Sequence, residues 1–506
     1  MSVFKRFVSC VILLSMLLVA IFCATNLFEK KDSDTKYNKF FEHSRDFDVL
    51  FFGSSHVING VYPMELWDDY GFTSYNFGGH SSQIATSYWV LKNALDYAKP
   101  KVVVIDCFEV SFQQKTSNNF SFVHMALDTF PLSNNKIKAA YDLLDDKEMQ
   151  KKIKNYEIEE KEKRTILGIL WDYSVYHSRW EEIDKADFEL TENLEYGAES
   201  RICIAQPGTI TENSGKKLTE ETVGIKYLKK MIEECKTEGI EVILTYLPYP
   251  ITGEFEWTEI NTLYDLSKEY DVDFLDFMSM NIVDYSTDCC DPSSHLNPSG
   301  ALKVTNYLGE FLKNNYHIQD HRNNLLYDYW NEDYKKYEKL KNVRLSMVDD
   351  LNTYLMLLED KNYGYIMNIG DNSIFSDETT IKLLKNKGVN IENISENTKH
   401  IIICGDNIEI INTNINENGD YGKIRIHFND NNTFSIYKSD QEVLNLETSA
   451  LSIIDGAICV NAFDIDDYHT ISDISYFKVP LASGLGGRIP NNEGVVILDS
   501  KAIRFY

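Results

Sequence analysis

Short apolar runs alternate with amphipathic segments across about the first 320 residues, and few folds accommodate such a pattern. The run Val-Leu-Phe-Phe stops at Gly53, and three consecutive valines follow Lys101. Short runs of apolar residues without polar interruption are typical of strands that are buried on both faces. The pattern predicts strands at 49–52, 73–77, 101–105, 242–247 and 274–277.

The segments between these strands have the spacing of helices. Apolar residues between Leu228 and Cys235 recur at intervals of three and four, with Thr219 as the predicted N-cap and Gly239 as the predicted end. Helices are expected at 82–97, 134–165, 219–239, 255–269 and 298–314. Strands that alternate with helices imply parallel β-α units, so we expect a doubly wound, three-layer α/β domain over residues 47–325. Sites in such sheets lie beyond the carboxyl ends of the strands.

The amino terminus contains an uncharged run from Phe7 to Phe28, preceded by Lys5 and Arg6. About 20 apolar residues suffice to cross a bilayer, and no A-x-A cleavage pattern follows the run. We therefore expect residues 1–30 to be an uncleaved membrane anchor, with a cleaved signal as the alternative. An acidic body after such an anchor favours a single-pass protein of the cell membrane whose body is extracellular. Residues 31–46 are polar and are interpreted as a stalk.

The character of the sequence changes after residue 325. A predicted strand at 365–369 and a helix at 378–387 precede several short β runs that are separated by Asn, Asp and Gly turns. These runs lie at 401–403, 408–411, 424–428 and 496–498. Residues 326–506 are therefore expected to form a separate, mainly β domain with some helix.

Composition excludes several classes of function. The net charge of -28 would repel nucleic acid, which is not expected as a partner. The nine cysteines show no C-x-x-C spacing, so we expect no metal site, and seven cysteines outside the anchor do not indicate a dense disulfide framework. A phosphate-binding G-x-x-x-x-G-K-[ST] loop is also lacking. We expect no cofactor.

Candidate catalytic residues follow three of the predicted elements. The first strand ends in Gly53-Ser54-Ser55-His56, the second in Asn76-Phe77-Gly78-Gly79, and Asp291 precedes His295 in a loop just before a helix. A serine at a tight glycine turn can be an activated nucleophile, and a glycine N–H can approach an oxyanion closely. A carboxylate that orients an imidazole, which deprotonates a serine, is the logic of a catalytic triad. Each motif alone is an ordinary turn or cap.

Taken together, these motifs resemble the SGNH, or GDSL, hydrolase superfamily, which has a flavodoxin-like three-layer fold. The resemblance implies that Ser55 is the nucleophile and His295 its base, with Asp291 as the orienting acid. It also implies that the backbone N–H groups of Ser55 and Gly78 bind the oxyanion.

Two departures from the family pattern affect this assignment. The family's oxyanion asparagine is missing after the third strand, where Ile105-Asp106-Cys107-Phe108-Glu109 stands instead. Loss of one oxyanion donor typically costs about 2.7–4 kcal/mol. In addition, Asp291 lies four residues before His295 where the family has three, which leaves Asp288 as an alternative acid; Asp291 is preferred.

A looser resemblance rests on the anchor, the segment Tyr176-His177-Ser178-Arg179-Trp180 and the form D-P-S-S-H-L-N-P-S-G. These features are similar to membrane-anchored SGNH proteins of bacterial surface polysaccharide assembly, among them alginate-type O-acetyltransferases and the lipoteichoic acid D-alanyl transfer protein. The likeness implies a surface-glycan substrate and a membrane partner that delivers the acyl group. His56, His177 and Arg179 are candidate substrate-binding residues, although an aromatic-rich segment is more often core.

The carboxyl-terminal part resembles the interleukin-like EMT inducer domain through the segments 363–372 and 456–464, which implies carbohydrate or partner binding. An accessory β domain without that role is the alternative. We expect the whole chain to be a serine O-acyltransferase or esterase that acts on acyl esters, foremost acetyl esters, of a cell-surface polysaccharide. Two alternatives remain: an esterase for small soluble substrates, and a non-catalytic glycan-binding or scaffold protein on a decayed SGNH fold.

Overall fold

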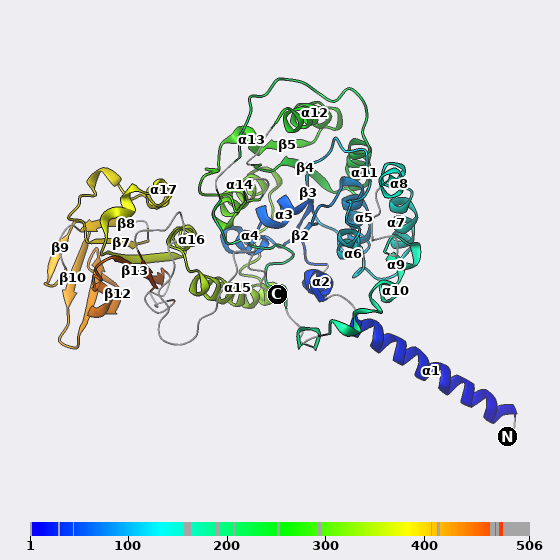
Figure 1. The fold of residues 1–506 in the computed structure, drawn as a ribbon, viewed down its shortest axis with the longest axis horizontal. Coiled ribbons are helices and arrows are strands. Elements are labelled where there is room, and N and C mark those ends of the chain that lie inside the picture. Colours follow the sequence, from blue (N-terminus) through cyan, green and yellow to red (C-terminus); the bar gives the residue numbers. More distant parts are fainter. Residues whose placement is uncertain are drawn as a thin grey trace.

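The computed structural model describes most of the chain and combines an apolar amino-terminal helix, an α/β unit and a unit of antiparallel sheets (Figure 1). The described residues are 3–28, 31–43, 45–155, 163–183, 185–188, 192–205, 208–249, 253–291, 295–405, 407–411, 415–465, 471 and 475–478.

A five-stranded parallel sheet forms the centre of the α/β unit. The strands are β1 (Val49–Gly53), β2 (Ser74–Gly78), β3 (Val102–Asp106), β4 (Glu241–Tyr246) and β5 (Asp273–Asp276). Their order in the sheet is β2-β1-β3-β4-β5, and all pairs are parallel. This is the order of flavodoxin-like, doubly wound folds. The predicted fold class and all five predicted strands are confirmed.

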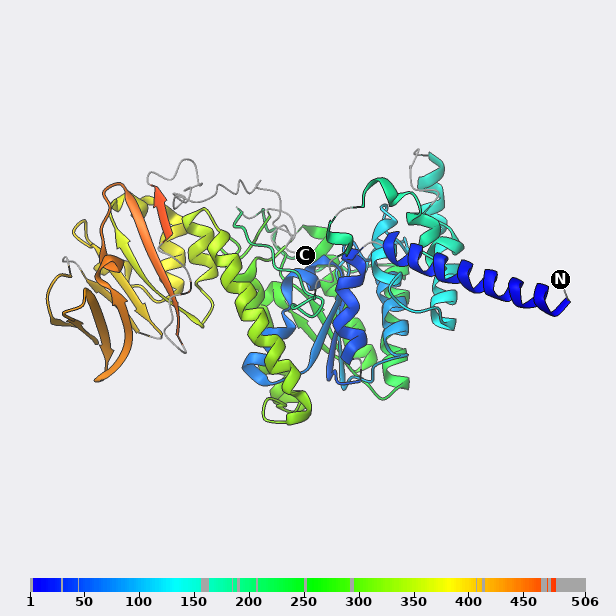
Figure 2. The same ribbon diagram turned by 90° about the horizontal axis from the view of Figure 1, so that it is seen from below.

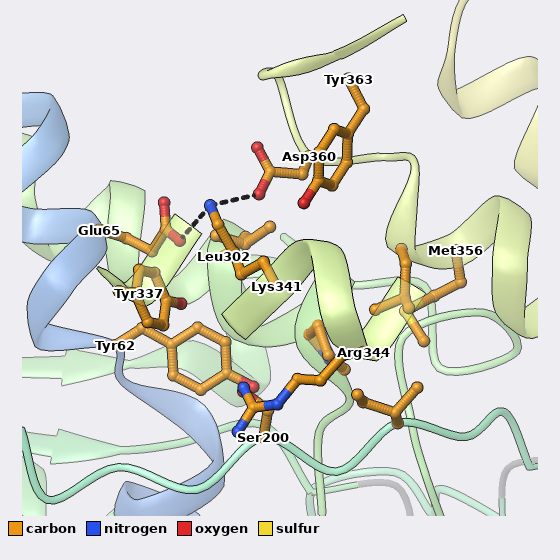
Figure 3. A pocket seen from close by; sticks show the side chains of 13 residues that line it. Tyr62, Glu65, Ser200, Leu302, Tyr337, Lys341, Arg344, Met356, Asp360 and Tyr363 are labelled. Atoms are coloured by element: carbon orange, nitrogen blue, oxygen red, sulfur yellow. Dashed lines mark hydrogen bonds and ion pairs between the residues drawn. The ribbon is translucent and has the colours of Figure 1, made fainter. Parts of the chain in front are cut away.

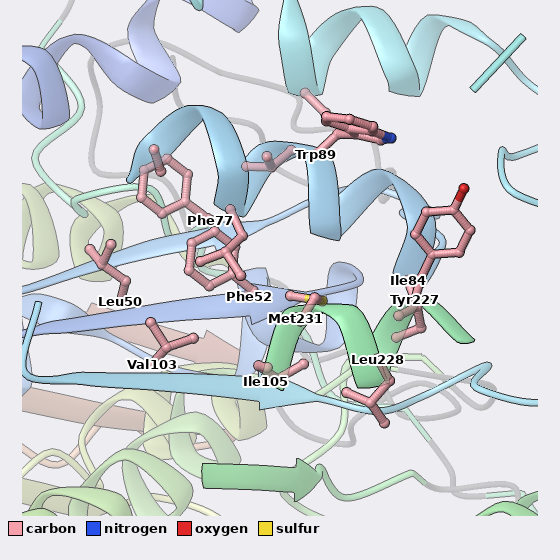
Figure 4. Packing of buried hydrophobic residues seen from close by; sticks show 14 of the residues in the cluster. Leu50, Phe52, Phe77, Ile84, Trp89, Val103, Ile105, Tyr227, Leu228 and Met231 are labelled. Carbon is pink, nitrogen blue, oxygen red and sulfur yellow. The ribbon is translucent and has the colours of Figure 1, made fainter. Parts of the chain in front are cut away.

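Helices cover both faces of the sheet, because successive strand residues alternate between two cores. Leu50 and Phe52 belong to one core, while Val49 and Phe51 belong to the other. The first core packs against α2, α5, α11 and α12, and the second against α4, α13 and α14. Figure 4 shows the first core, where side chains of β1, β2 and β3 meet those of α5 and α11.

The helices of this unit, in chain order, have the following bounds: α2 (Lys31–His43), α3 (Ser55–Gly60), α4 (Pro63–Tyr70), α5 (Ile84–Ala94), α6 (Ser121–Leu127), α7 (Asn134–Leu144), α8 (Lys147–Asn155), α9 (Ile166–Leu170), α10 (Tyr173–Tyr176), η2 (Arg179–Glu181), η3 (Lys185–Phe188), α11 (Val223–Thr237), α12 (Glu254–Tyr270), α13 (Phe277–Met280) and α14 (Pro298–Tyr316).

Two predicted helices differ from the observed ones. The expected helix at 134–165 is wrong as a single element: α7 ends at Leu144, and a new helix begins after Asp146. The side chain of Asp146 accepts hydrogen bonds from Met149 N at 3.0 Å and from Lys115 N at 2.7 Å, so it caps α8 and holds a distant loop. Helix α11 begins at Val223 rather than beyond Thr219, because Thr222 supplies the cap through a 3.0 Å bond from Ile225 N.

The predicted stalk is also part of the folded unit. Helix α2 occupies residues 31–43, and its Tyr37 and Phe40 are buried in the first core. The Phe40 ring lies 4.7 Å from that of Phe77 on β2. The many polar residues around these aromatics made the segment resemble a linker in composition. In the structure, the aromatic side of the helix packs against the sheet.

Helix α1 (Val3–Phe28) leaves the body of the molecule and makes no part of either core (Figures 1 and 2). Its residues Phe4–Thr25 have a mean hydropathy of 2.8 and are long and apolar enough to cross a membrane. The predicted helix is therefore present, and its properties are compatible with a single-pass anchor.

The carboxyl-terminal unit contains two antiparallel sheets, with orders β14-β13-β6-β7-β8 and β12-β11-β10-β9. One face of the five-stranded sheet packs on α16 and α17, and the other face packs on the four-stranded sheet. The predicted strands near 365, 401, 408 and 424 and the helix at 378 are confirmed, whereas the expected strand at 496–498 lies outside the described residues. The elements are α16 (Leu351–Leu357), β6 (Tyr363–Ile369), α17 (Glu378–Asn386), β7 (His400–Cys404), β8 (Asn407–Ile411), β9 (Gly419–Tyr421), β10 (Ile424–Phe428), β11 (Thr433–Lys438), β12 (Gln441–Glu447), β13 (Ala457–Asp464) and β14 (Ser475–Lys478). All nine cysteines of the chain are described, and all are free thiols.

Helix α15 (Asp328–Met347) belongs to both units. Near its start, Trp330 is fully buried and its ring lies 4.2 Å from that of Tyr196 and 5.2 Å from that of Trp67. Near its end, Leu345 belongs to the core of the carboxyl-terminal unit. The helix therefore joins the two cores without an intervening linker.

Buried ion pairs reinforce this junction (Figure 3). Lys341 Nζ lies 3.0 Å from Glu65 of α4 and 2.8 Å from Asp360, which follows α16. Burial alone would lower the pKa of Lys341, but the two carboxylates raise it well above its usual value, so the ammonium remains charged. Arg344 forms a two-point ion pair with Glu195 at 2.8 and 2.6 Å. The adjoining cavity of about 30 Å³ has room for a water molecule and not for a substrate.

Trp330→Ala should lower the free energy of unfolding of the full chain by about 3–5 kcal/mol, because it opens a cavity between aromatic rings. Denaturant unfolding in detergent would measure the change. Leu326→Ala is the matched control: its side chain is exposed, so the change should stay within about 0.5 kcal/mol. Equal losses in both variants would contradict the role given to Trp330.

Candidate active site

Ser55 stands directly beyond β1, at the start of α3. Gly53 permits the sharp turn there, since a Cβ at this position would lie 2.6 Å from Val57 Cγ2 and 2.8 Å from Asp106 Cβ. The Ser54 hydroxyl caps α3 by accepting a hydrogen bond from His56 N at 3.3 Å. The turn thus leaves the neighbouring serine, Ser55, as the first residue of the helix.

His295 lies in the loop that precedes α14, and backbone bonds fix this loop from both sides. Cys290 N donates to His295 O at 3.0 Å, and Asn297 N donates to Asp288 O at 2.9 Å. Asn297 also caps α14 through a 3.2 Å bond from Gly300 N. These contacts hold the imidazole at the carboxyl edge of the sheet.

The structure brings Ser55, His295 and Asp291 into one hydrogen-bonded line. His295 Nε2 lies 2.8 Å from Ser55 Oγ, and His295 Nδ1 lies 2.6 Å from Asp291 Oδ2. The alternative acid, Asp288, is instead fully buried and accepts hydrogen bonds from Lys303 Nζ at 2.8 Å. The insertion before His295 therefore still leaves Asp291 within reach of the ring.

Arg201 was not anticipated from the sequence and completes this cluster. Its Nη1 lies 2.9 Å from His295 Nδ1 and 3.4 Å from Asp291 Oδ2. Only one of the two neighbours can bond Nδ1 at a time: a protonated Nδ1 donates to Asp291, and an unprotonated Nδ1 accepts from Arg201. The guanidinium thus affects both the charge and the tautomer of the imidazole.

Arg201 belongs to a strap, residues 195–205, that runs between the two units. Ile202 packs in the core of the carboxyl-terminal unit, while Glu199 N donates to Ile58 O at 3.0 Å beside the site. The Glu199 carboxylate lies 3.1 Å from His80 Nε2. The strap has no helical or strand pattern, so no local signal in the sequence indicated that it reaches the site.

Burial lowers the pKa of His295 below its ordinary value of 6.5. The Arg201 guanidinium lowers it further, and the hydrogen bond with Asp291 opposes both effects. The imidazole is therefore predominantly neutral at pH 7, which is the form that can accept a proton from Ser55.

Gly78 does not present a free N–H in this structure. Its N–H donates to Asn76 Oδ1 at 2.9 Å, and the Asn76 amide in turn donates to Val57 O and Val61 O at 2.7 and 2.8 Å. Asn76 thereby fastens α3 to β2. The expectation that Gly78 donates to an oxyanion requires the bond to Asn76 to break.

The third strand ends in a buried carboxyl group where the family pattern has an amide nearby. Asp106 Oδ1 accepts from Leu247 N at 2.9 Å, and no partner for its Oδ2 is found among the described residues. Burial raises the pKa of Asp106 to about 7. A substantial fraction of this side chain is therefore protonated at neutral pH.

His56 lies beside the site but is not on its surface. The ring is buried, 5.8 Å from the ring of His295 and 4.1 Å from that of Phe108. Burial lowers the pKa of His56 to about 3, so it is neutral. In this position it supports the shape of the site and supplies no positive charge to it, so its role in binding a substrate stays a prediction.

Arg179 contacts the end of α1, and His177 ends α10, the helix that packs beside α1 (Figure 1). Arg179 Nη1 donates to Phe28 O at 2.9 Å, and its Nη2 lies 2.8 Å from Asp187. His177 is exposed at the end of α10. The segment that carries them packs against helix α1, and their role in binding a substrate stays a prediction.

One group of side chains has the spacing of metal ligands. Ligand atoms of Cys290, Asp291 and His295 lie within 4.8 Å of one another. Zinc requires a thiolate, but the pKa of the Cys290 thiol is raised because this thiol donates a hydrogen bond to the Cys203 sulfur and is buried, so it keeps its proton. Two of the three groups are also already bonded to each other. The donor set fits a hydrogen-bonded triad better than a metal centre.

Comparisons with known proteins give little further information. No family model matches the chain, and no curated protein matches it. A crystal structure from Bacteroides fragilis NCTC 9343, described as a candidate acylhydrolase, is 12% identical over 55% of this chain and 94% of its own, with a TM-score of 0.27. Function must therefore be inferred from the geometry of the site.

The pKa of His295 in the full chain should lie below 6.5. The variant Arg201→Gln should have a higher His295 pKa, because the substitution removes a positive charge beside the ring. NMR of histidines labelled with ¹³C at Cε1 would measure both values, with the resonance assigned through His295→Gln. Arg322→Gln is the control, since that guanidinium pairs with Asp320 instead. An unchanged titration in Arg201→Gln would show that the guanidinium does not act on His295.

Proposed function

We propose that the chain is a serine esterase or O-acyltransferase of the SGNH type. The observation that carries the proposal is the continuous line of hydrogen bonds from Ser55 Oγ through His295 to Asp291, at 2.8 and 2.6 Å. A neutral imidazole between a hydroxyl and a carboxylate is the arrangement that activates a serine.

The first half of the reaction forms an acyl-enzyme. His295 Nε2 takes the proton of Ser55 as Oγ attacks the carbonyl carbon of an ester, and Asp291 stabilises the resulting imidazolium. Collapse of the tetrahedral intermediate breaks the bond to the alcohol oxygen, which receives the proton from Nε2. In the second half, His295 deprotonates water or a sugar hydroxyl, which attacks the acyl group and releases Ser55 with its proton restored.

Oxyanion stabilisation is the less complete part of the site. The backbone N–H of Ser55, at the first position of α3, is the first proposed oxyanion donor. Gly78 can add a second donor only by releasing Asn76. A slow reaction is the expected consequence, since each missing donor reduces the rate by about 10²–10³-fold.

The proposed substrate is an acyl ester, foremost an acetyl ester, of a cell-surface polysaccharide. This rests on the resemblance to membrane-anchored surface enzymes and on the apolar helix α1, which suits a protein retained at the membrane. We further propose that the α/β unit lies on the extracellular side, and that a membrane protein supplies the acyl group.

A non-catalytic glycan-binding or scaffold role is the second candidate, and one observation favours it. Arg201 Nη1 lies 2.9 Å from His295 Nδ1, and a hydrogen bond between them would place the ring proton on Nε2. A protonated Nε2 cannot accept the proton of Ser55. The N–H of Gly78 is already bonded to Asn76, which also favours a non-catalytic role. Reactivity of Ser55 separates the two proposals.

Incubation of the full chain in detergent with a fluorophosphonate should give a single adduct in intact-mass measurements, and Ser55→Ala should abolish it. Ser54→Ala is the matched control: its hydroxyl caps α3 and makes no bond to His295 in the described contacts, so labelling should persist. If the folded wild type gains no adduct, the scaffold proposal replaces the enzymatic one.

Asp291→Asn should slow labelling of Ser55 by about 10⁴-fold, because an amide in this position favours the wrong tautomer of His295. The rate constant of adduct formation is the measurement. Asp288→Asn should have a much smaller effect once circular dichroism shows that it is folded, since Asp288 bonds to Lys303. The reverse order of effects would make Asp288 the orienting acid.

A further inference from the structure

The segment 166–188, which comprises α9, α10, η2 and η3, packs against the carboxyl end of α1. Contacts join α1 to α10 and to η3. Trp171 Nε1 donates to Thr25 Oγ1 at 3.4 Å, and the Tyr173 ring lies 6.0 Å from that of Phe28. Arg179 donates to the Phe28 carbonyl at the end of the helix. This segment is therefore fixed at one end of the apolar helix.

The length of α1 places its carboxyl end at a membrane surface. Residues Phe4–Thr25 would extend about 33 Å, close to the thickness of the hydrocarbon layer. Thr25 and Phe28 then lie where the apolar layer meets the headgroups. Side chains bonded to these two residues lie at the same level.

Large apolar side chains are exposed on this same segment. The exposed fractions are 57% for Leu167, 38% for Trp171, 64% for Trp180 and 70% for Phe188. Single exposed apolar residues are ordinary on protein surfaces, but four within one short segment that packs on an apolar helix are not. Tryptophan in particular is enriched where membranes meet water, because its ring is apolar and its N–H is polar.

We propose that the segment 166–188 rests in the headgroup region of the bilayer that α1 crosses. Trp180, Phe188 and Leu167 would be covered by lipid, and Arg179, in its contact with Phe28, would hold this surface against the end of the anchor. The protein would then contact the membrane at two places, which restricts the rotation of the α/β unit about α1. The proposal rests on α1 as a membrane span and is independent of the reactivity of Ser55.

The tryptophans of the chain make the test specific. Trp67, Trp89, Trp257 and Trp330 are buried in the protein, so Trp171 and Trp180 are the two whose emission can respond to lipid. The full chain is placed in nanodiscs of phosphatidylcholine, either unmodified or brominated in the upper part of the acyl chains. Trp171→Phe leaves Trp180 as the reporter, and Trp171→Phe with Trp180→Phe is the matched control.

In Trp171→Phe, brominated lipid should quench most of the Trp180 emission, and aqueous iodide should quench little of it. The double variant should show no bromine-dependent loss. Quenching of Trp180 by iodide and not by brominated lipid would mean a surface open to water and would overturn the proposal. Protection from both quenchers would overturn it as well, and would indicate a second protein on this surface.

Retention of the chain in the discs at alkaline pH in carbonate tests the premise separately. Retention without bromine quenching overturns the proposed surface alone. Loss of the chain from the discs overturns the membrane span and the proposal with it. Fluorophosphonate labelling of Ser55 in the same samples would report on the proposed chemistry in either case.

Discussion

The common direction of the five parallel strands is the constraint on which the site depends. Parallel pairing from β2 to β5 brings every carboxyl end to one edge of the sheet. Ser55 follows β1, and His295 follows β5 across 240 residues of sequence, yet their side chains are 2.8 Å apart. The local turns only refine this meeting: Gly53 permits the turn before Ser55, and Asn297 begins the helix after His295.

Around this edge, the strap and the carboxyl-terminal unit complete the environment of the imidazole. Arg201 reaches His295 because its neighbour Ile202 is held in the other core. The Ser299 hydroxyl, on the helix that follows His295, is bonded to Glu359 of the carboxyl-terminal unit. The second unit is thus packed against the two segments that influence the charge and the position of the His295 imidazole.

The sequence predicts the framework well and the environment poorly, for a physical reason. Apolar runs and glycine turns are local signals in the sequence, so they were sufficient to predict the strands β1 to β5 and the turn at Ser55. The aromatics of α2 were hidden among polar residues, and the cap at Thr222 competed with an equally plausible one at Thr219. The position of Arg201 and the hydrogen bond from Gly78 to Asn76 depend on tertiary contacts, which produce no periodic pattern in the sequence. The sequence therefore predicted the three side chains that form the hydrogen-bonded line, and it missed the residues that surround them.

The position of helix α15 affects how the chain folds during its synthesis. Trp330 completes the aromatic stack of the α/β core, and Tyr337 is buried about two helical turns further along α15. Domains generally fold as units during synthesis, the amino-terminal one first. Here the first core stays unfinished until the ribosome has passed residue 337, with Trp67 and Phe47 uncovered in the meantime. A nascent chain of this protein must therefore be kept from aggregating until about two-thirds of it has been translated.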